Sequence, residues 1–154
     1  NKTPEQRLKR LWRSSRDSAR TPMQWSDAEN AGFTTGRPWF YVNPNYREIN
    51  VAAQEKDPDS LLNFYRRAIA LRKSLPAVRY GSYRELLHSS RKLYAYVREW
   101  EGSRLLVVCS FSEEPVALPK RLRAGDGRLL LGSYAGEADP RTLRPYEARV
   151  YQFE

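Results

Sequence analysis

The spacing of apolar residues changes along the chain, from a helical period before residues 76–80 to a strand-like period after them. Asp57 and Pro58 predict the N-cap and first position of a helix, and Pro76 predicts its end. Two apolar strips run side by side along this helix, so we expect it to have two packing partners. The strips consist of Leu61, Phe64, Ala68, Leu71 and Leu75, and of Leu62, Tyr65 and Ile69.

A shorter helix is predicted near the start of the sequence. Thr3 can cap it, Pro4 suits the first helical position, and Gln6 completes a capping box. Apolar residues follow at helical spacing, and we expect the helix to end at about Arg13.

The second half of the chain consists of short apolar segments separated by Gly and Pro turns, as in an antiparallel β-sandwich. Turns are expected at Glu101–Gly102 and at residues 125–127. The predicted strands cover residues 80–88, 93–100, 104–111, 115–119, 128–134 and 143–153.

Residues 16–50 follow neither period, and irregular chain is expected to continue to about Lys56. A structureless loop of this length is rare in a compact domain unless it has a function. Its aromatic residues Trp25, Trp39 and Tyr46 predict an ordered loop that is packed by its own side chains. We expect this loop to shape a site rather than to perform the chemistry.

The composition argues against several classes of function. The net charge of +9 is spread along the chain, and without a nucleic-acid-binding motif we expect solvated arginine faces rather than nucleic-acid binding. The residues show no metal-ligand spacing and no phosphate loop, so no metal, no cofactor and no catalytic residue is assigned. His88 is expected to be a surface or hairpin residue. Cys109 is expected to be buried and unreactive, which fits a cytoplasmic location.

No apolar run is long enough for a membrane span. We therefore expect no contact with a membrane.

Polar chemistry gathers in the loop at Arg16, Asp17 and Arg20. An aspartate between two arginines can form a local ion pair and leave one guanidinium to bind vicinal hydroxyls or a carboxylate. The alternative is that both arginines are structural. Residue chemistry alone favours this alternative.

A family resemblance changes that balance. The motif Arg-Thr-Pro-Met-Gln-Trp at residues 20–25, followed by Asn-Ala-Gly-Phe at 30–33, resembles the oligo-1,6-glucosidase and dextran glucosidase branch of the α-amylase superfamily. The similarity continues through Asp-Pro-Asp-Ser at 57–60 and Leu-Arg-Pro-Tyr-Glu-Ala at 143–148, and it covers nearly the whole chain. Ser18 departs from the asparagine that many members have.

The resemblance implies a retaining glycoside hydrolase whose catalytic carboxylates lie upstream of this chain. Residues 1–78 would form the end of the catalytic (β/α)₈ barrel, namely the loop after the eighth strand and the eighth helix. Residues 79–154 would form the C-terminal antiparallel β-sandwich, which gives a mixed fold class. Arg20 is then expected to bind hydroxyls of the non-reducing-end glucose, and Arg16 is the second choice.

The expected ligand is a short α-glucooligosaccharide with α-1,6 or α-1,4 linkages, and the expected partner is the missing barrel portion of the same protein. The second apolar strip of the helix would be bare in this chain, so self-association is also expected. The alternative function is a free-standing carbohydrate-binding or interaction module. Its stacking face would use Tyr83, Tyr94, Tyr96, Trp100 and Tyr134.

Overall fold

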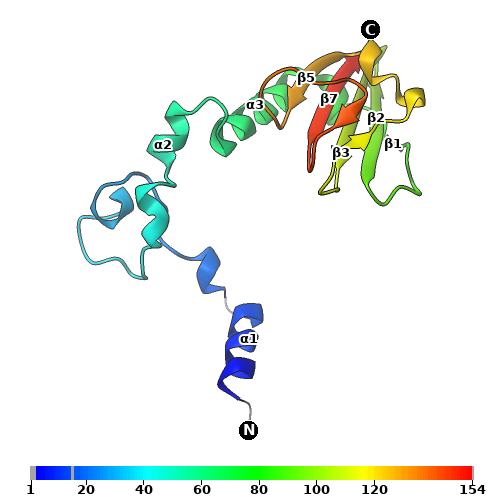
Figure 1. Ribbon diagram of the computed structural model, residues 1–154. Coiled ribbons are helices and arrows are strands. Elements are labelled where there is room, and N and C mark those ends of the chain that lie inside the picture. Colours follow the sequence, from blue (N-terminus) through cyan, green and yellow to red (C-terminus); the bar gives the residue numbers. More distant parts are fainter. Residues whose placement is uncertain (1–2, 15, 154) are drawn as a thin grey trace. The chain divides into compact units, whose positions relative to one another are not determined.

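A computed structural model describes residues 3–14 and 16–153, and it divides the chain into two compact units (Figure 1). The loop unit comprises residues 1–58, and the strand unit comprises residues 59–154. The family-domain boundary at 78/79 is a different division, and it stays a prediction.

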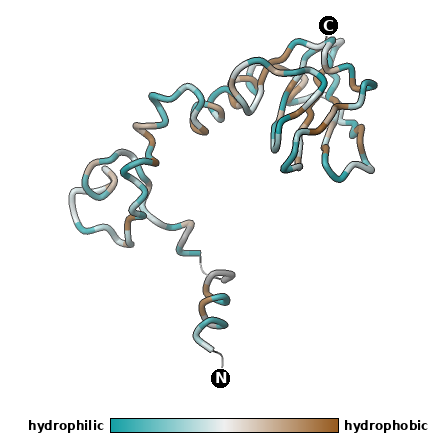
Figure 2. Tube along the Cα trace, in the orientation of Figure 1, coloured by the Kyte–Doolittle hydropathy of each residue, from teal (hydrophilic) through white to brown (hydrophobic). Residues whose placement is uncertain are grey.

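The loop unit begins with α1, Pro4–Ser14, as the capping box predicts. The Thr3 amide donates to Gln6 Oε1 at 3.2 Å, and the Gln6 amide donates to Thr3 Oγ1 at 3.3 Å. Most of the following chain is polar (Figure 2). It contains three short 3₁₀ turns and one further helix. These are η1 (Asp17–Ala19), η2 (Glu29–Gly32), η3 (Pro44–Arg47) and α2 (Val51–Lys56).

Helix α2 was not expected from the sequence, which predicts irregular chain up to Lys56. Asn50 nucleates it, because its Oδ1 accepts a hydrogen bond from the Ala53 amide at 2.8 Å. With six residues the helix is too short for a periodic apolar pattern to reveal it.

The long helix of the strand unit, α3, covers Leu61–Ser74, so the predicted start at Asp57 is wrong. Ser60 is the N-cap, and its Oγ accepts a hydrogen bond from the Asn63 amide at 3.2 Å. Pro76 does stop this helix, but it also takes the first position of a further short helix, α4 (Pro76–Tyr80). The second apolar strip is largely bare in this chain, because Tyr65 and Ile69 are exposed.

The strands form a five-stranded antiparallel sheet in the order β1-β2-β3-β7-β5, with a separate two-stranded pair, β4 and β6. The antiparallel sheet is as predicted. The strands are β1 (Arg84–Glu85), β2 (Leu93–Trp100), β3 (Ser103–Ser110), β4 (Val116–Ala117), β5 (Arg128–Gly132), β6 (Thr142–Leu143) and β7 (Ala148–Phe153).

Three strand predictions are wrong in extent. The segment 115–119 is a strand only at Val116 and Ala117. The segment 80–88 pairs with β2 only at Arg84 and Glu85. The segment 143–153 is split because Pro145 lacks an amide hydrogen and Tyr146 adopts a left-handed φ of 54°. As a result β6 pairs with β4, whereas β7 pairs with β3 and β5.

One face of the sheet forms the core of the strand unit. Alternate residues of β2 and β3 point into this face, as the strand period requires. They meet apolar residues from β4, β6 and the 3₁₀ turns η4 (Lys120–Leu122) and η5 (Ala124–Asp126). The cluster includes Leu93, Ala95, Val97, Leu106, Val108, Leu118, Leu122, Ala124, Leu143 and Tyr151.

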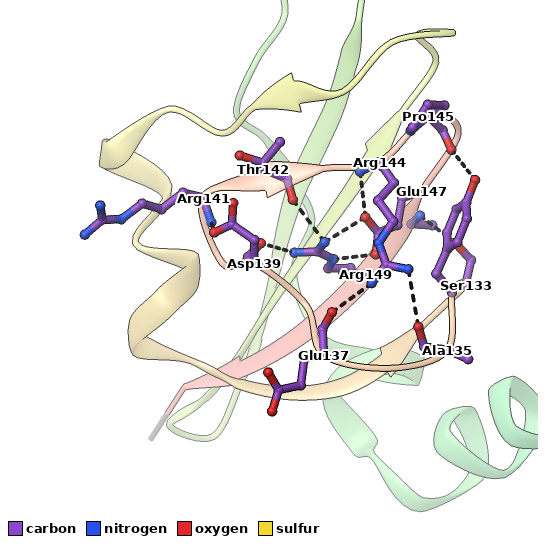
Figure 3. Close-up of polar contacts among 12 residues, drawn as sticks. Ser133, Ala135, Glu137, Asp139, Arg141, Thr142, Arg144, Pro145, Glu147 and Arg149 are labelled. Carbon is purple, nitrogen blue, oxygen red and sulfur yellow. Dashed lines mark hydrogen bonds and ion pairs between the residues drawn. The ribbon is translucent and has the colours of Figure 1, made fainter.

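A buried ion pair joins this core to the long segment between β5 and β7 (Figure 3). Arg149 is 1% exposed and Glu147 is 2% exposed. Arg149 donates from Nε to Glu147 Oε1 at 2.8 Å and from Nη2 to Glu147 Oε2 at 2.7 Å. It also donates to the carbonyl oxygens of Asp139 at 2.5 Å and Thr142 at 3.0 Å, and to the Tyr151 hydroxyl at 3.1 Å. The pair is therefore bidentate, and its guanidinium is tied to three other groups.

We expect Arg149→Met to lower the free energy of unfolding by about 3–5 kcal/mol, because it leaves a buried carboxylate unpaired. Arg123→Met is the control, since Arg123 pairs with Asp126 at an exposed position and should cost less than about 1 kcal/mol. Urea denaturation followed by fluorescence measures both values. Equal values for the two variants would contradict a stabilising role of the buried pair.

Stability should also fall in acid through Glu147. Burial would raise the pKa of this carboxyl, but hydrogen bonds from Arg149 and from the Arg144 amide outweigh burial and hold the pKa below its ordinary value of 4.5. The stabilisation is thus present above that ordinary pKa and is lost as the pH falls through the lower, folded-state pKa. Glu147→Gln should flatten this loss between about pH 5 and pH 2, as measured by urea midpoints. Parallel pH curves for the two proteins would contradict it.

Candidate functional site

Arg16 and Arg20 flank a single 3₁₀ turn in the structure. The Ala19 amide donates to the Arg16 carbonyl at 3.1 Å, and the Arg20 amide donates to the Asp17 carbonyl at 3.0 Å. Both arginines are exposed. The turn therefore separates the two predicted binding residues by one turn of backbone, while the predicted ion pair of Asp17 and the binding roles stay predictions.

Hydrogen bonds join the two ends of the loop just after Arg20. The Gln24 side-chain amide donates to the Ile49 carbonyl. The Val51 amide donates to the Gln24 carbonyl at 3.0 Å, and the Ala52 amide donates to the Trp25 carbonyl at 3.0 Å. Residues 24–25 and 49–52 thus form one base, and the intervening segment is a closed loop.

The tip of the loop folds around the carbonyl of Ala31, a fully buried residue. This oxygen accepts hydrogen bonds from the Trp25 amide at 2.9 Å and the Ser26 amide at 3.1 Å. Asn30 and Ala31 have left-handed φ values of 52° and 59°, and Gly32 follows at 65°. The Asn30 side chain donates to two further loop carbonyls, at residues 34 and 36.

The loop is therefore ordered and packed by its own groups, as predicted. Of the three predicted aromatic anchors, Tyr46 is half-buried, but Trp25 and Trp39 are wrong for this chain. Trp25 is 50% exposed and Trp39 is 65% exposed. Amide side chains hold the loop instead, chiefly those of Gln24, Asn30 and Asn50. Their hydrogen bonds satisfy backbone groups that irregular chain leaves unpaired.

An aromatic ladder lies beside the tip, and sequence reasoning missed two of its members. The rings of Trp39 and Phe40 are 5.4 Å apart, and those of Phe40 and Tyr41 are 4.7 Å apart. With Arg37 they line an open cavity of about 600 Å³. Three consecutive aromatic residues were the available signal, because aromatic residues with a nearby polar group are typical of ligand-binding surfaces.

The rest of the described chain offers little other chemistry. Within residues 3–14 and 16–153, no cluster of three His, Cys, Asp or Glu side chains could hold a metal ion. In the same ranges no helix has the length and apolar character to cross a bilayer. His88 is exposed, as predicted, with Nδ1 3.6 Å from Glu85 Oε1. Cys109 is half-buried rather than buried, and burial raises the pKa of its thiol.

Comparison with known families agrees with the loop motif and the helix that follows it. The family described as alpha amylase, catalytic domain, matches residues 1–81, which is more than half of the chain. The chain belongs to the alpha-amylase family. The resemblance expected from residues 20–25 and 30–33 is thereby confirmed.

Relatives within the alpha-amylase family match almost the full chain. An oligo-1,6-glucosidase from Parageobacillus thermoglucosidasius is 43% identical over 97% of this chain. A trehalose-6-phosphate hydrolase from Escherichia coli (strain K12) is 43% identical over 87% of it. The alignments cover 28% and 25% of these two proteins, so the chain spans little more than a quarter of the length of the curated relatives it matches.

Solved structures of alpha-amylase family enzymes resemble the chain in fold as well. The isomaltulose synthase from Klebsiella sp. LX3 matches with a TM-score of 0.85 and 41% identity, over 98% of this chain and 28% of that protein. The trehalulose synthase from Pseudomonas mesoacidophila MX-45 matches equally well, with a TM-score of 0.85 and 41% identity over the same shares.

The order of the loop at residues 16–50 should depend on Gly32. A Cβ at this position would lie 2.6 Å from Ser26 Oγ, and the φ of 65° disfavours any side chain. Gly32→Ala should therefore cost about 1–2 kcal/mol locally, so the Trp25 and Ser26 amides should exchange hydrogen roughly tenfold faster. Hydrogen exchange followed by NMR measures these amides.

Gly36→Ala is the matched control for this experiment. Gly36 lies in the same loop, but its φ is not positive and the nearest atom to an added Cβ is Thr34 Oγ1 at 3.8 Å. Its substitution should leave the exchange of both amides unchanged. If Gly32→Ala behaved in the same way, the Ala31 turn would not control the order of the loop.

Proposed function

We propose that this chain is the C-terminal part of a retaining α-glucosidase that acts on the non-reducing end of short α-glucans, through α-1,6 or α-1,4 linkages. The family match over residues 1–81 is the observation that supports this most strongly. The names of relatives, oligo-1,6-glucosidase among them, point to glucosides as substrates. The catalytic carboxylates would lie in the part of the enzyme that precedes this chain.

In this proposal the loop at residues 16–50 forms one wall of the substrate pocket. Barrel enzymes build their active sites from loops at the carboxyl ends of the strands, and a loop after the eighth strand belongs to that face. Arg20 binds hydroxyls of the terminal glucose with its exposed guanidinium, and Arg16 is the second candidate. The joined base of the loop supports this role, because it begins four residues after Arg20 and limits how far Arg20 can move.

The helix α3 would be the eighth barrel helix, and the strands would form the C-terminal sandwich that stabilises the enzyme. Exposed apolar residues on α3 support this assignment, because the rest of the barrel would cover them in the complete enzyme. The residues concerned are Leu61, Tyr65 and Ile69. Self-association of the chain without its barrel would cover the same strip, and it stays a prediction.

The aromatic face that would make a free-standing binding module is only partly available. The Tyr83 and Tyr94 hydroxyls are hydrogen-bonded to each other at 2.8 Å, which raises the pKa of Tyr83 to about 12. The rings of Tyr83 and Tyr94 each pack within 5.4 Å of the Tyr96 ring. These tyrosines contact one another and do not form a flat stacking platform, which favours the enzyme over the module.

In the complete enzyme, Arg20→Ala should lower kcat/KM for isomaltose roughly 10- to 100-fold. The physical reason is the loss of a charge-assisted hydrogen bond, which costs about 1.5–3 kcal/mol. Steady-state kinetics measures this, with Arg72→Ala as the control at an exposed arginine on α3.

Two results would count against the proposal. Arg20→Ala with unchanged kcat/KM would place the hydroxyl-binding residue elsewhere. Hydrolysis of an aryl α-glucoside by the 154-residue chain alone would overturn the location of the carboxylates, because retaining hydrolysis needs two carboxyl groups about 5 Å apart.

A further inference from the structure

A cavity in the strand unit lies at the end of the sheet where β7 ends. Its volume is about 880 Å³, within the range of small-molecule sites. Three separate parts of the chain form its walls: the turn between β2 and β3, the segment from η5 into β5, and the end of β7. The loop at residues 16–50 contributes nothing to it.

Aromatic rings form part of the wall, and neighbouring residues hold them in place. Trp100 is 37% exposed, and its ring packs against Tyr80 of α4 at a centroid distance of 5.7 Å. Phe153 lies against Gly127, where an added Cβ would be 2.9 Å from the ring carbon Cζ. Only glycine at position 127 leaves room for this ring. The apolar part of the wall is thus fixed before any ligand binds.

Planar polar side chains surround the rings. The Arg104 guanidinium lies over the Phe153 ring at 5.2 Å, and its Nε is 3.5 Å from Glu99 Oε1. The Arg128 guanidinium donates to Gln152 Oε1 at 2.8 Å. A guanidinium has five N–H donors, so one such bond leaves others for a ligand.

The charges that line the cavity cancel. The three arginines, at positions 104, 123 and 128, face three acidic residues at positions 99, 101 and 126. The carboxylates would repel a bound anion, and the guanidinium groups would repel a bound cation. A ligand whose groups both donate and accept hydrogen bonds fits this mixture better than either ion. Sugar hydroxyls are such groups, and the C–H face of a sugar ring can pack on an aromatic ring.

We propose that this cavity binds a neutral glucose oligosaccharide, with one sugar ring packed on Trp100 of β2 and hydroxyls of a further ring bonded to Arg128 of β5 and Gln152 of β7. The choice of glucose as the sugar rests on the proposed function. The site itself rests on the rings, the balanced charge and the size of the cavity. The cavity would hold a segment of substrate or product on the strand unit.

The test is a titration of the 15N-labelled 154-residue chain with isomaltotriose, followed by NMR at the indole N–H of its tryptophans. The Trp100 signal, assigned with Trp100→Phe, should shift saturably with a Kd of about 1 mM. Arg128→Ala should weaken binding at least about fivefold, because it removes the donor beside Gln152. Arg91→Ala is the matched control, since Arg91 is an exposed arginine of the same unit outside the cavity. It should leave the Kd unchanged.

Three outcomes would overturn the proposal. The Trp100 signal could stay fixed in a chain whose spectrum is folded, Arg128→Ala and Arg91→Ala could bind equally well, or inorganic phosphate could displace the sugar. The result is separable from the proposed function. Arg20→Ala without effect in the complete enzyme would leave the Trp100 titration standing, and a silent Trp100 would leave the Arg20 kinetics standing.

Discussion

The strand unit depends on one buried guanidinium. Arg149 carries its charge into a core that is otherwise apolar, and this is tolerable only because Glu147 neutralises it and carbonyl groups take its remaining donors. The carbonyls belong to Asp139 and to Thr142 of β6, both in the segment between β5 and β7. The buried charge therefore determines the path of that segment, whereas the apolar residues form the core.

In the loop unit, backbone polar groups also need hydrogen-bond partners, and uncharged side chains supply them. Its backbone leaves helical and extended conformations repeatedly, so its amides and carbonyls cannot pair in a regular ladder. Asparagine and glutamine side chains take their place, because an amide side chain can donate and accept at once. The exposed tryptophans of the loop are then not needed for its order. They are left as surface on which another part of an enzyme, or a ligand, could pack.

Regular periodicity determined how well the sequence predicted the fold. Strand β2 was predicted to the residue and β3 to within one residue, because eight alternating or apolar positions leave little ambiguity. The last strand was predicted too long because Tyr146 interrupts it. A tyrosine side chain gives no indication of a left-handed φ. The sequence placed the cap of α3 at Asp57 rather than Ser60, because both side chains can cap a helix and they lie three residues apart.

The candidate site was predictable only in part, for a similar reason. Motif resemblance located Arg20 and its loop, but residue chemistry alone favoured a structural role for it. The consecutive aromatic residues Phe40 and Tyr41 were a signal in the sequence, but neither source used it. The cavity at Trp100 was invisible in the sequence, because its residues come from positions about fifty apart and have no common motif.

The closed base of the loop has a consequence for how such proteins can diversify. Gln24 and Trp25 are bonded directly to Ile49, Val51 and Ala52, so the residues between them leave and return through the same point. An insertion or deletion in that span changes the size of the excursion without passing strain to the chain on either side. Arg20, four residues before this base, could therefore keep its place while the loop changed in length.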